Sequence, residues 1–123
     1  MLIIDAANVI GSRPTGWWRD RAGAAADLVR RVRAAVGAGR LPPPVVVVLE
    51  GAARAGEPEG SAGGVQVIHA RGGGDDRIAA LVAGAAGGVV VVTADRELRR
   101  RVEAGGAVVH GPRWVWEQVD ATG

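Results

Sequence analysis

Five short apolar runs recur along the chain, and each is bounded by glycine, proline or charged residues. The longest run, Val45 to Leu49, is continuous rather than alternating. A continuous run of β-branched residues is typical of a strand buried on both faces, as in parallel sheets. The pattern therefore predicts strands over residues 1–4, 45–49, 65–69, 89–92 and 107–109.

Between these runs, apolar residues recur at helical spacing. Leu28, Val32 and Ala35 share one face of a segment that starts at a potential cap, Asp20, and stops at Gly37. The same reasoning predicts helices over 20–36, 75–86, 95–104 and 112 to about 119. Glycine and polar residues predict loops over 8–15 and 51–64.

The order of these elements is typical of one fold class. Apolar strands that alternate with helices predict an α/β protein, a three-layer α/β/α sandwich around a mainly parallel five-stranded sheet. A length of 123 residues without an internal repeat predicts a single domain over 1–123.

Composition excludes several kinds of chemistry. The chain has neither Cys nor Lys, which excludes disulfides, thiolate metal sites, P-loop lysines and Schiff bases. Its 15 basic residues are all Arg and its net charge is only +2, so the positions of the arginines decide whether it binds a polyanion. No apolar run has membrane-spanning length and no basic segment precedes one, so we expect a cytoplasmic protein without a membrane partner.

Five acidic residues lie at the ends of predicted elements. Asp5, Glu50 and Asp95 follow three of the strands, and Asp75 and Asp76 open the helix before the fourth strand. Because the carboxyl ends of parallel strands meet at one edge of a sheet, we expect these side chains to converge. Clustered carboxylates repel one another unless they bind a cation or hold protons. Oxygen ligands without Cys favour Mg²⁺ or Mn²⁺.

Each acid also has a purely structural interpretation. Asp95 can cap the following helix, Glu50 can end a strand, and the acids that open a helix can complement its dipole. Asp5 is harder to explain in this way, because Ala6 and Ala7 follow it and nothing there requires a charge.

Further candidate residues lie near the same edge. Asn8 is either a turn residue or a donor that orients Asp5 or a bound water. Arginine and tryptophan side chains follow Asp5 and Asp95, where they either contact nucleic acid or form a solvated helix face and cover the core. The candidates for RNA contact are Arg13, Trp17, Arg19, Arg96, Arg99 and Arg100.

Three segments carry a family resemblance. They run from Leu2 to Gly11 (LIIDAANVIG), from Gly74 to Ile78 (GDDRI) and from Val91 to Leu98 (VVTADREL). An opening strand with Asp and then Asn, an acidic pair at a helix start, and a strand followed by Ser/Thr-x-Asp together resemble the PIN-like nucleases. The similarity is to their NYN group, which includes bacterial ribosome-associated endoribonucleases, and it runs in order to about Gly111.

The resemblance implies a PIN-like fold and a metal-dependent endoribonuclease that hydrolyses RNA phosphodiester bonds. It implies that Mg²⁺ or Mn²⁺ is the cofactor and RNA the partner, and it leaves open whether a ribosome or an antitoxin also binds. The catalytic residues that it implies are Asp5, Asn8, Asp75, Asp76 and Asp95. The metal ligands that it implies are Asp5, Asp75, Asp76 and Asp95, with Glu50 as a further ligand.

Two other classes of protein stay open. One is a catalytically inactive PIN-like domain that binds RNA or protein. The other is a small Rossmann-like nucleotide binder or phosphohydrolase, although neither G-x-G-x-x-G nor D-x-D follows the first strand. The three glycines over 72–74 precede a helix and are a weak signal for phosphate binding.

Overall fold

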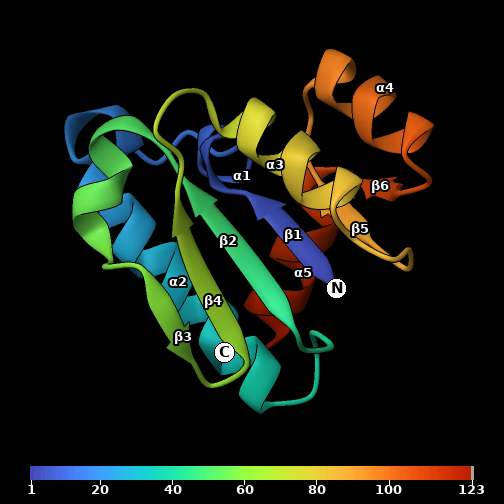
Figure 1. Cartoon of the computed structure of the whole chain (residues 1–123). Coiled ribbons are helices and arrows are strands. Elements are labelled where there is room, and N and C mark those ends of the chain that lie inside the picture. The colour runs from blue at the N-terminus through green and yellow to red at the C-terminus, as the bar shows by residue number, and fades with distance from the viewer. Residues whose placement is uncertain (123) are drawn as a thin grey trace.

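A six-stranded sheet forms the middle layer of the computed structural model, which describes residues 1–122 (Figure 1). Five strands run parallel in the order β4-β2-β1-β5-β6, and β3 pairs antiparallel with β4 at one edge. The strands are β1 (Leu2–Asp5), β2 (Val45–Leu49), β3 (Gly60–Ala62), β4 (Val65–His69), β5 (Val90–Val92) and β6 (Val108–His110). The predicted α/β fold with a mainly parallel sheet is confirmed.

Helices cover both faces of the sheet. One face carries α1 (Ala6–Gly11), α2 (Arg21–Gly37) and α5 (Pro112–Thr122), and the other carries α3 (Gly74–Ala83) and α4 (Arg96–Ala104). Two 3-10 helices, η1 (Trp17–Arg19) and η2 (Gly51–Gly56), lie in the connections. Within residues 1–122, no helix combines the length and the apolar character that a membrane crossing requires.

The strands bury side chains on both faces, as the continuous apolar runs predicted. Ile4 and Val47 pack in the core beneath α2 and α5, whereas Ile3 and Val48 pack beneath α3 and α4. All five residues of β2 are buried. Burial on both faces explains why the two central strands, β1 and β2, contain no polar residue before the last position of β1.

The predicted helix over 20–36 is confirmed within one residue, including its cap. The Asp20 side chain accepts a hydrogen bond from the Gly23 amide at 2.8 Å. This contact satisfies one of the amide groups that the first turn of a helix leaves without a partner.

Two predictions about connections are wrong. The segment 51–64 is not a plain loop, because it contains η2 and the extra strand β3, which raises the strand count from five to six. Residues 6–11 form α1, so the predicted loop over 8–15 begins too early. Ala6, Val9 and Ile10 recur at helical spacing and are buried together, which stabilises this short helix.

The strand order makes the carboxyl ends of the central strands the place where a ligand is expected to bind. The chain passes from β1 to β2 and β4 on one side, and then crosses to β5 and β6 on the other. The carboxyl ends of β1, β2 and β5 therefore surround the point where the connections diverge. Open α/β sheets bind their ligands at such a point.

Candidate functional site

Asp5 is a buried carboxylate at the end of the central strand. The residue is only 3% exposed and stands at the N-cap position of α1, where its side chain makes no cap hydrogen bond. Asn8 Nδ2 donates to its Oδ2 at 2.6 Å, and Thr93 Oγ1 donates to the same oxygen at 2.8 Å. Neither bond occupies Oδ1, so this arrangement orients the carboxylate while leaving one oxygen for another ligand.

Thr93 links Asp5 to Asp95. Its hydroxyl donates to Asp5 and accepts the Asp95 amide at 3.1 Å. Asp95 Oδ1 in turn accepts the amides of Glu97 and Leu98, so the predicted capping role of Asp95 is confirmed. This relay ties the end of β1 to the start of α4 across the sheet edge.

Thr93→Val is expected to lower the free energy of unfolding by about 1.5–3 kcal/mol, the range for hydrogen bonds to charged groups. Valine has nearly the same shape but cannot donate to the buried Asp5 carboxylate. Thr93→Ser keeps the hydroxyl and is the matched control. Urea denaturation measures both variants, and equal stability of the two would contradict the relay.

The pKa of Asp5 is raised. Burial is the main cause, and the negative charge of Glu50 adds to it, while the hydrogen bonds from Thr93 and Asn8 act in the opposite direction. Within residues 1–122, no arginine forms an ion pair with Asp5. The ionised carboxylate therefore has hydrogen-bond donors but no positive partner.

Glu50 follows β2 and Asp75 lies in the first turn of α3, so both are at the carboxyl end of the sheet, as Asp5 is. A Cβ placed on Gly74 would be 2.9 Å from Glu50 Oε1, so the Glu50 carboxylate rests against the first residue of α3. Asp75, the next residue, is half-buried, and its Oδ1 accepts the Asp76 amide at 2.8 Å. Glu50 thus lies between Asp5 and the start of α3.

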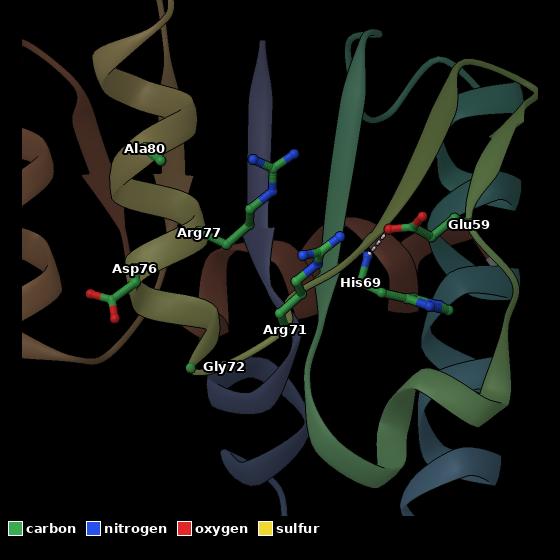
Figure 2. A pocket seen from close by; sticks show the side chains of 8 residues that line it. Glu59, His69, Arg71, Gly72, Asp76, Arg77 and Ala80 are labelled. Atoms are coloured by element: carbon green, nitrogen blue, oxygen red, sulfur yellow. Dashed lines mark hydrogen bonds between the residues drawn. The ribbon is translucent and has the colours of Figure 1, made fainter.

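The structure does not bring Asp76 to this group. Its carboxylate is 79% exposed and pairs with Arg101 of α4 at 3.0 Å. Figure 2 shows Asp76 on the side of α3 that faces away from Arg71 and Arg77. Asp76 as a metal ligand stays a prediction that would require this ion pair to break.

The donor set fits a hard divalent cation in its chemistry, because it offers only oxygen atoms and an uncompensated negative charge. As the side chains stand, no three His, Asp or Glu groups within residues 1–122 lie close enough to hold one metal ion. A shared ion therefore requires the Glu50, Asp75 or Asp95 side chain to turn toward Asp5. We name Asp5, Glu50, Asp75 and Asp95 the acidic rim.

The predicted RNA-contact residues have different surroundings. Arg13 and Arg99 are engaged in ion pairs with Asp120 and Glu103. Trp17 is half-buried and packs against the core, so it contributes to the fold whatever else it contacts. Arg19 lies 5.9 Å from the Trp18 ring centre. Arg96 and Arg100 are exposed on α4.

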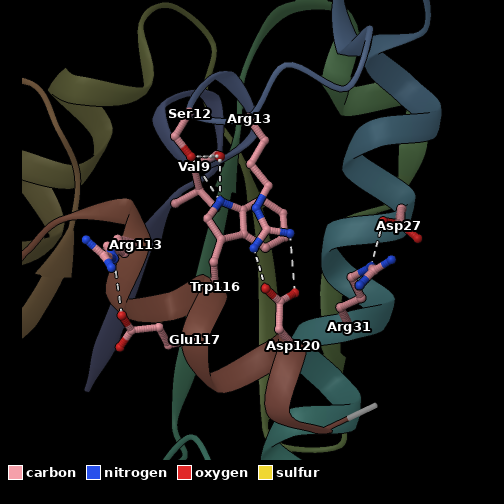
Figure 3. Close-up of polar contacts among 9 residues, drawn as sticks. All are labelled: Val9, Ser12, Arg13, Asp27, Arg31, Arg113, Trp116, Glu117 and Asp120. Carbon is pink, nitrogen blue, oxygen red and sulfur yellow. Dashed lines mark hydrogen bonds and ion pairs between the residues drawn. The ribbon is translucent and has the colours of Figure 1, made fainter.

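Arg13 belongs to a clasp between α1 and α5, formed with Trp116 and Asp120 (Figure 3). Its guanidinium lies 3.9 Å above the Trp116 ring and pairs through two nitrogens with Asp120. Trp116 Nε1 donates to Val9 O at 3.1 Å and to Ser12 Oγ at 2.9 Å. The clasp holds α5 against the helix that carries Asn8.

The clasp predicts a pH-dependent loss of stability. The hydrogen bond from Arg13 lowers the pKa of Asp120, so this pair stabilises the fold above the ordinary aspartate pKa of about 3.9 and ceases to do so as the pH falls through the lowered value. Asp120→Asn should therefore lower Tm at pH 7, and by less at pH 2–3.

Glu117→Gln is the control, because its pair with Arg113 is exposed on the same helix. We expect it to change Tm little at pH 7. Circular dichroism measures the melting, and an Asp120→Asn effect of equal size at both pH values would contradict the clasp.

Sequence reasoning missed some residues near the acidic rim. It did not identify Thr93 as an orienting residue, although a hydroxyl two positions before Asp95 at a strand end was a usable signal. It also missed Arg71 and Arg77, which line a cavity with His69 and Gly73 (Figure 2). No sequence pattern indicated that these two arginines share a cavity.

Two solved structures match the fold over nearly the whole chain. Rae1 (YacP) from Bacillus subtilis gives a TM-score of 0.73 at 20% sequence identity, over 99% of this chain and 74% of that chain. A single-substitution mutant of Rae1 gives 0.74 at 21% identity, over 98% of this chain and 74% of that one. No protein-family model and no curated protein matches significantly. The likeness establishes a shared fold.

Proposed function

We propose that the protein is a metal-dependent endoribonuclease that hydrolyses RNA phosphodiester bonds at the acidic rim. The observation that carries this proposal is Asp5, a carboxylate that is 3% exposed, oriented by two hydrogen bonds and without an arginine partner within residues 1–122. Burying a charge in this way is costly unless a cation compensates it. The sequence resemblance to PIN-like NYN nucleases and the fold shared with Rae1 support the same interpretation.

The four carboxylates of the acidic rim are the expected metal ligands, and two neighbouring residues are the expected orienting groups. Asp5, Glu50, Asp75 and Asp95 would hold Mg²⁺ or Mn²⁺, and Asn8 and Thr93 would fix the direction of the Asp5 carboxylate. A bound divalent ion would supply the positive charge that stabilises the attacking and leaving oxygens of an in-line displacement.

Thr93 carries the hydroxyl that contacts the acidic rim. The Thr93 side chain is buried, and its hydroxyl donates a hydrogen bond to Asp5 and accepts one from the Asp95 amide, so it is not free to attack a phosphate. Water is therefore the expected nucleophile, and the expected products carry 5′-phosphate and 3′-hydroxyl ends. Asp5 and Asp95 would act by holding the ion and would form no covalent bond with RNA.

RNA cleavage by the double variant Asp5→Asn/Asp95→Asn tests the proposal. Asparagine caps helices about as well as aspartate, so α4 keeps its first turn in this variant. We expect Mn²⁺-dependent cleavage to disappear while the far-ultraviolet circular dichroism spectrum is retained. Cleavage at the wild-type rate would overturn the assignment.

One observation favours a second candidate, a PIN-like domain that binds RNA or protein without catalysis. No three carboxylate or imidazole groups within residues 1–122 stand ready around one ion, and Asp95 is already engaged as a cap. Calorimetric titration with Mn²⁺ separates the two candidates. Retained RNA affinity without any metal binding would favour the binding domain, and metal binding that Asp5→Asn removes would favour the nuclease.

A further inference from the structure

A cavity of about 580 Å³ lies beside the acidic rim, between α3 and the end of β4. Its walls come from His69 at the end of β4, the connection that contains Arg71 and Gly73, and Arg77 on α3. Figure 2 shows the Arg71 and Arg77 side chains reaching into the space between α3 and β4. Nucleotide-sized ligands occupy cavities in this range of volumes.

The two arginines of the cavity have no anionic partner. Within residues 1–122, neither Arg71 nor Arg77 forms an ion pair or a side-chain hydrogen bond, although many other arginines of the chain do. Two guanidinium groups that face one cavity raise its positive potential and favour an anion there. The planar donors of arginine match phosphate oxygens in particular.

The two carboxylates that also line the cavity, those of Glu59 and Asp76, pair with groups other than Arg71 and Arg77. Glu59 Oε1 accepts the His69 amide at 2.7 Å, and Asp76 pairs with Arg101 outside the cavity. His69 Nε2 lies 2.7 Å from Glu57 O, which fixes the ring against the wall. The positive charge of Arg71 and Arg77 is therefore not cancelled by an ion pair within the cavity.

The cavity and the acidic rim share one segment of chain. Gly73 lines the cavity, Gly74 touches the Glu50 carboxylate, and Asp75 belongs to the rim. A Cβ placed on Gly72 would meet no atom within 4 Å, so the wall there is open to an approaching backbone. A polymer with regularly spaced phosphates can place one phosphate in the cavity and a neighbouring one at the rim.

We propose that this cavity binds one nucleotide of a single-stranded RNA, with Arg71 and Arg77 holding the phosphate next to the bond that is cut. The inference rests on the proposed function, since the acidic rim is taken as the place of cleavage. The volume is sufficient for one nucleotide. Because the polar contacts go to phosphate, this subsite positions RNA without selecting its sequence.

Fluorescence anisotropy with a labelled single-stranded 12-nucleotide RNA tests the proposal. Binding is measured in EDTA, where metal-dependent cleavage does not proceed, over a series of salt concentrations. The variant Arg71→Gln/Arg77→Gln should bind at least about tenfold more weakly at low salt. The slope of log Kd against log salt should fall by about 0.7, since the two arginines hold one phosphate and each phosphate contact on a single strand contributes roughly 0.7.

The matched control is Arg30→Gln/Arg40→Gln, which also removes two positive charges. Arg30 lies on α2 and Arg40 precedes β2 at the opposite end of the strands, and both are exposed. We expect this control to change affinity less than twofold. Wild-type affinity and salt slope in Arg71→Gln/Arg77→Gln, or an equal loss in the control, would overturn the cavity as a phosphate subsite.

A cleavage assay with Mn²⁺ separates failure of this inference from failure of the proposed function. If wild type cleaves RNA, Arg71→Gln/Arg77→Gln should raise KM at least about tenfold with kcat changed less than threefold. If wild type binds RNA without cleaving it and the variant loses that binding, the subsite stands and the nuclease proposal falls. If wild type cleaves and the variant has the wild-type KM, the subsite falls and the nuclease proposal stands.

Discussion

Asp5→Asn is expected to lower Mn²⁺-dependent RNA cleavage by at least about a thousandfold, because charge stabilisation by a bound ion contributes several kcal/mol to the transition state. The same substitution should leave Tm without metal at or above that of wild type. An asparagine oxygen still accepts from Asn8 and Thr93, while the buried charge and its repulsion by Glu50 disappear. Loss of activity with a gain in stability is typical of a site that binds a ligand rather than supports the fold.

The stability difference should depend on pH with a definite sign. Burial raises the pKa of Asp5, so the ionised carboxylate destabilises the wild-type fold increasingly as the pH rises above about 4, the unfolded value. The gain of Asp5→Asn should therefore be small in acid and grow toward neutral pH.

Glu103→Gln is the control for Asp5→Asn. It removes a carboxylate at the far end of α4 from the rim and disrupts only the exposed pair with Arg99. Cleavage should stay within about twofold of wild type. Activity that survives in Asp5→Asn, or falls equally in Glu103→Gln, would contradict the role of Asp5.

Gly56→Ala is expected to destabilise the fold by about 2–4 kcal/mol, at or above the usual cost of overpacking. A Cβ at this position would lie 2.1 Å from the Ala22 carbonyl oxygen and 3.0 Å from the Ala26 amide nitrogen. These atoms belong to the α2 backbone and cannot turn aside as a side chain would. Relief requires η2 to move away from α2, and η2 begins directly after Glu50.

Gly37→Ala provides the contrast. A Cβ there meets no atom within 4 Å, and the residue ends α2, so alanine should stabilise by about 0.5–1 kcal/mol. Urea denaturation of both variants measures the two effects. Gly56→Ala with wild-type stability would mean that η2 does not pack closely on α2.

The sequence predicts those parts of the fold in which a residue pattern is compatible with a single type of structure. The continuous valines of β2 are explained only by burial on both faces, and Asp20 at the start of an amphipathic segment is explained by capping. Asp5 stands out for the same reason, since a charge directly after a buried strand has no structural purpose. Its burial and the donors on its Oδ2 agree with that interpretation.

Two of the elements that sequence reasoning missed, η2 and β3, consist mostly of small residues. Gly56 permits a close approach to α2, and β3 consists of exposed Gly60, Ser61 and Ala62, which show no alternation of apolar and polar residues. Glycine and polar residues predict a loop locally, whereas the neighbouring helix and strand determine the structure here. The pairing of β3 with β4 becomes visible only when the sheet is formed.

The arginines show a second limit of sequence reasoning. Arg13 pairs with Asp120 and Arg101 pairs with Asp76, and both partners are distant along the chain. Arg13 was a candidate for RNA contact because it follows Asp5 in the sequence. In the structure it contacts Asp120 and Trp116 in the clasp. The sequence did not predict a role for Arg71 and Arg77, because only the fold places them in one cavity.

Crystals soaked in Mn²⁺ and measured at a wavelength where manganese scatters anomalously test the central claim most directly. The claim predicts an anomalous peak about 2.0–2.3 Å from a carboxylate oxygen of Asp5, with at least one further ligand from Glu50, Asp75 or Asp95. A fully soaked crystal with no peak at Asp5, and with Asp5 still bound only to Asn8 and Thr93, would contradict it.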